Sequence, residues 1–113
     1  MSRSMIPDDL KVLLQHPESI TLLDVRRRVD FDADTVMLPG ARWFDPEQIS
    51  TWSQGLLKDK ESVLYCAHGR AVSNSVVDYL QSHGFRARFI EGGIAAWKES
   101  GEETVPKSHG DHG

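Results

Sequence analysis

The residue with the clearest potential for chemistry is Cys66, the only cysteine in the chain. It directly follows the short apolar run 62–65, and a loop containing Gly69 separates it from a helical pattern that begins at Val72. Open parallel sheets bind ligands at this point, where a buried strand ends and a helix begins. Backbone N–H groups and the helix dipole converge there and stabilise a thiolate. The pattern indicates a nucleophile, although it also suits cysteine phosphatases, and a lone cysteine is often only a small buried apolar side chain.

The residues after the cysteine have the composition of an anion-binding loop. They are Ala67, His68, Gly69, Arg70, Ala71 and Val72. Gly69 gives the backbone the freedom to turn its amides inward, because glycine accepts dihedral angles that other residues avoid. Arg70 adds a fixed positive charge, and His68 adds one that depends on pH. The alternative for these two side chains is a surface or steric role.

The elements that must position this loop follow from the hydrophobic pattern. Short apolar runs predict buried strands over 19–25, 62–65 and 85–90. Proline, glycine and apolar spacing predict helices after Pro7, over 46–55, from Val72 to Gly84, and from Gly93 onward. This alternation predicts an α/β fold with three layers, a small central parallel sheet flanked by helices on both faces.

Residues 29–38 do not predict a clear element, since Phe31 stands alone among acidic side chains. The chain of 113 residues is long enough for one core. We expect a single domain over 1–104 and a polar, flexible tail over 105–113. The tail carries His109 and His112, but two histidines on a mobile segment are a weak basis for a metal site, and we expect no metal and no cofactor.

The bulk composition is that of an ordinary globular protein, with 39% hydrophobic and 27% charged residues. A net charge of −4 argues against nucleic acid as a partner. No apolar run is long enough for a signal peptide or a membrane span, so we expect a cytoplasmic protein with no membrane contact. One cysteine excludes an intrachain disulfide.

Four motifs, in order along about residues 5–100, resemble the rhodanese-like domain family. The loop Cys66-Ala-His-Gly-Arg-Ala-Val resembles its active-site loop, and Asp24-Val-Arg resembles a motif at the end of an early strand. Pro39-Gly-Ala resembles its turn, and Gly92-Gly-Ile-Ala-Ala-Trp resembles the start of its last helix. Residues 32–38 depart from the family, which often has Gly-His-Ile before the turn. The resemblance therefore implies no conformation for this segment.

The resemblance implies a sulfurtransferase of the single-domain thiosulfate type. Cys66 would take sulfane sulfur from thiosulfate or a similar small anionic donor, and pass it from a persulfide to cyanide or a thiol. A thioredoxin-like protein could supply that thiol. Asp24 and Arg26 would act as a supporting structural pair.

Two alternatives remain at this stage. In the related phosphatases and arsenate reductases, five residues separate the cysteine from an arginine that binds the oxyanion. Here Arg70 is four positions after Cys66 and Val72 stands at the sixth, which favours sulfur transfer. The other alternative is a non-catalytic or weakly catalytic module that carries sulfur or senses redox state through the same cysteine.

Overall fold

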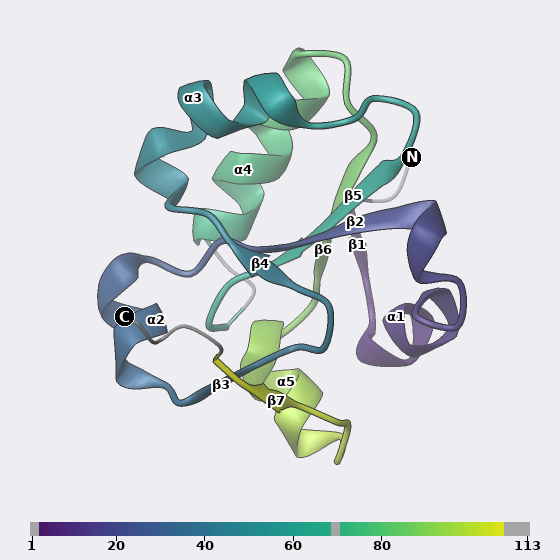
Figure 1. The fold of residues 1–113 in the computed structure, drawn as a ribbon, viewed down its shortest axis with the longest axis vertical. Coiled ribbons are helices and arrows are strands. Elements are labelled where there is room, and N and C mark those ends of the chain that lie inside the picture. The colour runs from purple at the N-terminus through teal and green to yellow at the C-terminus, as the bar shows by residue number, and fades with distance from the viewer. Residues whose placement is uncertain (1–2, 69–70, 108–113) are drawn as a thin grey trace.

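The computed structural model describes residues 3–68 and 71–107 (Figure 1). The helices are α1 (Pro7–Leu13), α2 (Arg28–Ala33), α3 (Ile49–Trp52), α4 (Ala71–Ser82) and α5 (Gly93–Glu99), with short 3-10 turns at Pro17–Ser19, Pro46–Gln48 and Ser53–Gly55. The strands are β1 (Ser4–Met5), β2 (Ile20–Asp24), β3 (Val36–Met37), β4 (Arg42–Trp43), β5 (Glu61–Tyr65), β6 (Ala87–Ile90) and β7 (Val105–Pro106). Within the described ranges, no helix is both long and apolar enough to cross a bilayer.

Five strands form a parallel sheet in the order β1-β6-β5-β2-β4. From β2 the chain proceeds to β4 on one side of the pair, and from β5 it proceeds to β6 on the other. The adjacent carboxyl ends of β2 and β5 are therefore the topological switch point of the sheet, which is where ligands bind in open parallel sheets. The predicted α/β fold with a central parallel sheet is confirmed.

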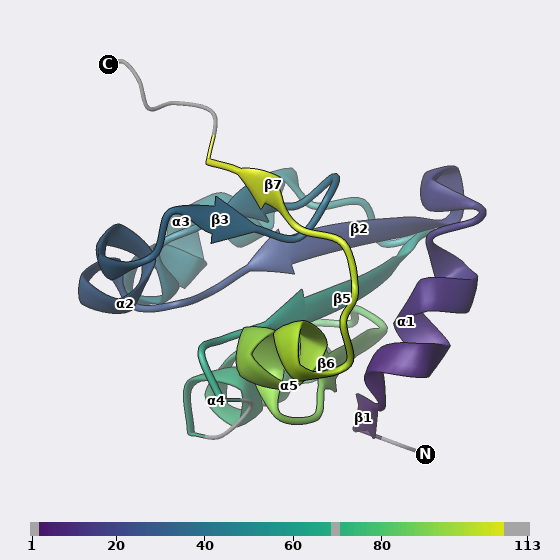
Figure 2. The ribbon, with the colours of Figure 1, turned by 90° about the horizontal axis from the view of Figure 1, so that it is seen from below.

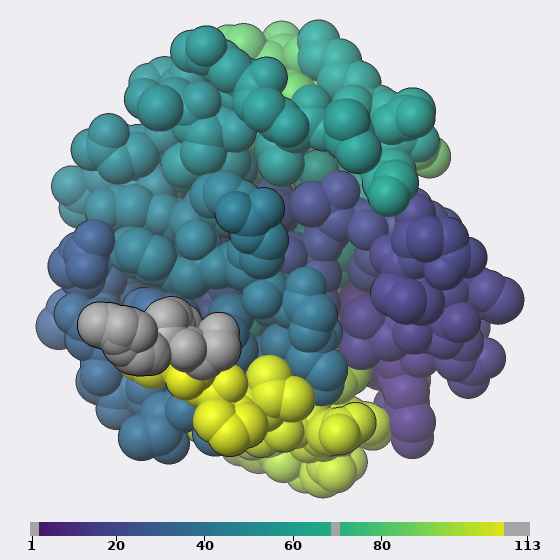
Figure 3. Space-filling model, in the orientation of Figure 1, coloured from purple at the N-terminus to yellow at the C-terminus, as the bar shows by residue number. Residues whose placement is uncertain are grey.

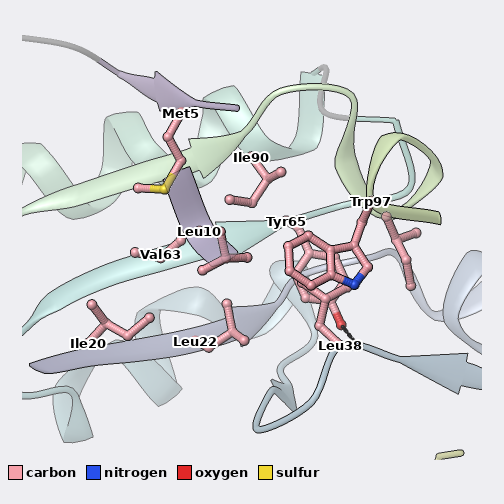
Figure 4. Packing of buried hydrophobic residues seen from close by; sticks show 10 residues of the cluster. Met5, Leu10, Ile20, Leu22, Leu38, Val63, Tyr65, Ile90 and Trp97 are labelled. Atoms are coloured by element: carbon pink, nitrogen blue, oxygen red, sulfur yellow. Dashed lines mark hydrogen bonds between the residues drawn. The ribbon is translucent and has the colours of Figure 1, made fainter. Parts of the chain in front are cut away.

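Helices cover both faces of this sheet, with α3 and α4 on one side and α1 and α5 on the other (Figure 1). Successive residues of β5 point to opposite faces, as the strand period requires. Val63 and Tyr65 belong to the cluster with α1 and α5, where Figure 4 shows Tyr65 beside Trp97. Leu64 and Cys66 belong to the cluster with α3 and α4. This alternation directs the thiol of Cys66 toward the α4 side.

Residues 29–38, for which the sequence predicts no clear element, include most of α2 and all of β3. Aromatic and cationic side chains from other parts of the chain contact this segment. The ring of Phe31 stacks on Trp43 with centroids 4.8 Å apart, and Lys107 Nζ lies 4.2 Å from the centroid of Phe31. Asp34 accepts hydrogen bonds from Arg26 and Lys98. Phe31 and one of the acidic residues around it are thus bound by aromatic and basic side chains from other parts of the chain.

The C-terminal segment belongs to the domain as far as residue 107, in contrast to the flexible tail expected from residue 105. Strand β7 pairs antiparallel with β3, and the N–H of Lys107 donates to the carbonyl of Thr35 at 3.1 Å. Figure 2 shows β7 alongside β3, and Figure 3 shows the C-terminal residues, in yellow, on the surface. This pairing is possible because residues 36–37, for which the sequence predicts no clear element, supply a strand edge for residues 105–106. The rest of the tail, with His109 and His112, lies outside the described residues.

Candidate active site

Cys66 is the first residue after β5 and is buried, with 6% of its surface exposed. The backbone carbonyls of Cys66 and of the next residue, Ala67, accept hydrogen bonds from the first turn of α5. The N–H of Ile94 donates to the carbonyl of Cys66 at 3.0 Å, and the N–H of Ala95 donates to that of Ala67 at 3.2 Å. Two otherwise unpaired helix N–H groups thereby fix the start of the Cys66 loop.

The glycine pair before α5 makes this anchor possible. Gly92 has a φ of +76°, and a Cβ added there would lie 2.5 Å from the Cβ of Ala96. Only glycine accepts both the dihedral angle and the close approach. Trp97 then buries its ring, and its Nε1 donates to the carbonyl of Glu103 at 2.7 Å. The Gly-Gly-x-x-x-Trp motif thus positions the helix that holds the cysteine loop.

The predicted anion-binding loop is described in part. Ala67 is half-buried and His68 is exposed, while Gly69 and Arg70 lie outside the described residues. Ala71, which is exposed, begins α4, and Val72 packs on the hydrophobic cluster that contains Cys66. The role of these residues in binding an anion stays a prediction.

Asp24 and Arg26 form a buried ion pair at the carboxyl end of β2, with 0% and 1% of their surfaces exposed. Arg26 Nη2 donates to Asp24 Oδ2 at 2.7 Å, and Nε donates to both carboxylate oxygens at 3.1 Å. The backbone N–H of Arg26 also donates to Oδ1 at 3.0 Å. The carboxylate therefore accepts hydrogen bonds both from the guanidinium group of Arg26 and from the backbone of the turn after β2. Burial lowers the pKa of Arg26, but the hydrogen bond and charge of Asp24 outweigh it, and the net shift is upward.

Tyr65, the residue before the cysteine, joins this pair to the Pro39-Gly-Ala turn. Its hydroxyl donates to Asp24 Oδ2 at 2.9 Å. It also accepts the N–H of Leu38 at 3.2 Å (Figure 4). Burial, followed by the negative charge of Asp24, raises the pKa of Tyr65 far above its usual value. The hydroxyl therefore stays protonated and holds two motifs against β5, the strand that directly precedes Cys66.

A half-buried acid extends the network to the surface. Asp34 Oδ2 accepts from Arg26 Nη1 at 3.0 Å and from Lys98 Nζ at 2.7 Å. Burial alone would raise the pKa of Asp34, but the hydrogen bonds from Lys98 and the Val36 N–H, with the charges of Lys98 and Arg26, outweigh it and lower the pKa. Alternating charges thereby join Asp24 at the end of β2, through Arg26 and Asp34, to Lys98 in α5.

Three residues of this network were not singled out as site residues from the sequence. Tyr65 has one local signal, its place next to the cysteine, whereas Asp34 and Trp43 have none. Trp43 Nε1 donates to the carbonyl of Arg26 at 2.8 Å, 17 positions away in the chain. Among the described residues, no group of three or more histidine, cysteine, aspartate or glutamate side chains could hold a metal ion.

Comparison with known proteins agrees with this geometry. Residues 6–100 match the family described as "Rhodanese-like domain". The chain is 35% identical over 99 residues to the Bacillus subtilis (strain 168) protein named "Putative sulfurtransferase YtwF", an alignment that covers 88% of this chain and 90% of that protein.

Solved structures show the same fold. A rhodanese-like domain protein from Staphylococcus aureus aligns with a TM-score of 0.77 at 30% identity, over 96% of this chain and 100% of its own. A rhodanese-related protein from Thermoplasma volcanium aligns with a TM-score of 0.80 at 27% identity, over 93% and 99%. The chain belongs to the rhodanese-like domain family.

Proposed function

We propose that this protein moves sulfane sulfur from thiosulfate, or a similar small anionic donor, to a thiophilic acceptor through a persulfide on Cys66. The observation that carries the proposal is the position of Cys66. The only cysteine of the chain directly follows β5 at the switch point of the sheet, before the loop that leads to α4. A nucleophile at that point meets the N–H groups of the loop and the positive end of the helix dipole.

The first step would be attack by the Cys66 thiolate on the outer sulfur of thiosulfate. A bond forms between the two sulfur atoms, the S–S bond of thiosulfate breaks, and its electron pair leaves with sulfite. The loop amides from Ala67 to Val72 would hold the negative charge of the donor and then of the persulfide. Arg70 and His68 would attract the anionic donor.

In the second step an acceptor nucleophile attacks the outer sulfur of the persulfide. The Cys66 S–S bond breaks and its electron pair returns to Cys66 as a thiolate, so the cycle needs no external oxidant or reductant. Cyanide, a small thiol or the thiol of a thioredoxin-like protein could each be the acceptor. A covalent relay of this kind gives ping-pong kinetics. The chain has no second thiol that could attack the persulfide from within.

The buried network supports this chemistry through position. Asp24, Arg26 and Tyr65 touch no reacting atom in the proposed steps, and they hold the ends of β2 and β5 together beside the cysteine. A loop whose start is fixed would need less reorganisation of its amides during the reaction. We therefore assign the pair to a supporting role.

The test is a thiosulfate–cyanide assay that measures thiocyanate, together with intact-mass measurement after thiosulfate treatment. We expect one added sulfur atom on the wild type and none on Cys66→Ala, with thiocyanate formation abolished in the variant. Ser82→Ala, an exposed change at the carboxyl end of α4, is the control and should keep both properties. The proposal is wrong if folded wild-type protein gains no sulfur, or if Cys66→Ala forms thiocyanate at the wild-type rate.

Two further results separate the alternatives. A stable persulfide that discharges slowly to every acceptor would indicate a sulfur-carrier or redox-sensing module. Hydrolysis of an aryl phosphate above the level of Cys66→Ala would indicate phosphatase chemistry and overturn the argument from the position of Arg70.

A further inference from the structure

A groove of about 460 Å³ lies at the amino end of α4. Its apolar floor consists of Ile49 from α3 and of Val72, Val76 and Tyr79 from α4. Two charged residues of opposite sign lie at its edge, Arg27 from the β2–α2 connection and Glu47 from the turn before α3. Both are exposed.

The groove lies on the same face and edge of the sheet as the cysteine. Its four floor residues pack on the hydrophobic cluster of which Cys66 is a member. The chain passes from Cys66 to the groove residue Ala71 in five steps, so their Cα atoms are at most about 18 Å apart. Arg27 follows β2 and Cys66 follows β5, the two strands that meet at the switch point.

The charges at the edge are available to a ligand. The backbone N–H of Glu47 donates to Asp45 Oδ1, but in the part of the chain that the structure describes the side chains of Arg27 and Glu47 form no salt bridge or hydrogen bond. The neighbouring arginines are engaged, since Arg26 is bound to Asp24 and the guanidinium of Arg28 lies 4.9 Å from the ring centre of Trp43. Of the run 26–28, only the middle arginine lacks such a contact among the described residues.

We propose that this groove binds the acceptor, and that the acceptor is a zwitterionic low-molecular-weight thiol of the size of an amino acid or a tripeptide. The inference rests on the proposed function. The carboxylate of the thiol would pair with Arg27, its ammonium group with Glu47, and its carbon skeleton would cover the apolar floor. A groove lined by an apolar floor and by one charge of each sign complements a molecule with both charges better than one with a single charge.

The chemistry at this site is transfer of one sulfur atom. The thiol of the bound acceptor loses its proton to solvent, and the thiolate attacks the outer sulfur of the Cys66 persulfide. The S–S bond to Cys66 breaks, its electron pair returns to Cys66, and the acceptor leaves as a persulfide. Binding at the groove would raise the rate by orienting the acceptor.

The test measures discharge of the persulfide in a single turnover. The protein is first loaded with thiosulfate, the added sulfur is verified by mass, and the second-order rate constant of discharge is measured for each acceptor. The zwitterionic probes are L-cysteine and glutathione. The comparison probes are cationic cysteamine, anionic 3-mercaptopropionate, neutral 2-mercaptoethanol and cyanide.

The variants are Arg27→Gln and Glu47→Gln, with Arg86→Gln and Glu99→Gln as controls at exposed positions outside the groove lining. We expect each groove variant to slow discharge by the zwitterions roughly twofold to fivefold, the range for exposed charge pairs. Arg27→Gln should slow 3-mercaptopropionate but not cysteamine, and Glu47→Gln should slow neither cyanide nor 2-mercaptoethanol. High salt should reduce the difference between wild type and variants.

The inference is overturned if the protein loads sulfur normally and the groove variants discharge the zwitterions as fast as the controls do. It is also overturned if the variants slow 2-mercaptoethanol as much as glutathione, because that result indicates a general effect on the loop. The inference is likewise overturned if only a thioredoxin-like protein, and none of the small thiols, discharges the persulfide, because the acceptor is then a protein. Failure to load sulfur at all refutes the proposed function instead, so the two failures are distinguishable.

Discussion

The buried pair of Asp24 and Arg26 allows the sharpest prediction about stability. Replacing Asp24 by asparagine keeps the shape of the side chain but removes its charge. Arg26, with 1% of its surface exposed, would then lose its principal counter-ion and keep only Asp34, whose side chain is 20% exposed. The new amide would also place an N–H group near the donors of Arg26 and Tyr65 that now point at the carboxylate.

Leaving a buried charge without its partner costs about 3 to 5 kcal/mol. A domain has about 5 to 15 kcal/mol of stability in total, so Asp24→Asn should remove a large share of it. At roughly 4 °C per kcal/mol for a domain of this size, Tm should fall by about 12 to 20 °C. Asp34→Asn is the matched control, and we expect about 1 kcal/mol or less because that carboxylate is partly solvated.

The assay is urea unfolding followed by tryptophan fluorescence and circular dichroism, with equal m-values as the check that the same transition is compared. The double variant Asp24→Leu with Arg26→Met removes both charges and should recover more than half of the loss. The reasoning is refuted if Asp24→Asn costs less than Asp34→Asn. It is also refuted if the double variant is as unstable as the sum of its single changes.

Two further predictions concern the anchor of the loop and pH. Gly92→Ala should lower the free energy of unfolding by about 2 kcal/mol or more and slow persulfide loading, because the alanine would combine a φ of +76° with a 2.5 Å contact. The control is Gly101→Ala, at φ +75° with nothing within 4 Å of the added Cβ. It should lose less stability and load sulfur normally. Since the pKa of Asp34 is lowered in the folded protein, its ion pairs stabilise the fold above the unfolded pKa of about 4 and are lost as pH falls through the folded value. The difference in urea midpoint between wild type and Asp34→Asn should therefore be constant at neutral pH and disappear under strongly acidic conditions, and a difference that grows in acid would contradict this sign.

Much of the candidate site could be predicted because its signals are local. The apolar runs that became β2 and β5 lie next to Asp24 and Cys66, so the end of each strand places each side chain. The pair of Asp24 and Arg26 is separated by two positions, a spacing that a turn after a strand brings together. The glycine pair before Trp97 likewise marks the start of a helix from its own neighbourhood.

The structure of residues 29–38 and the groove beside α4 depended on contacts between segments that are distant in the sequence. Phe31 and Lys107 are 76 positions apart, and Asp34 and Lys98 are 64 apart, so no local pattern showed that the unplaced segment would meet the end of the chain. The same holds for the groove, whose edge charges Arg27 and Glu47 come from opposite sides of β4 in the sequence. Cys66, the strand before it and the helix after it follow from the sequence alone, because local hydrophobicity and backbone preference determine them. What surrounds the cysteine was decided only by the tertiary structure, because the order of the strands determines which distant side chains share the switch point.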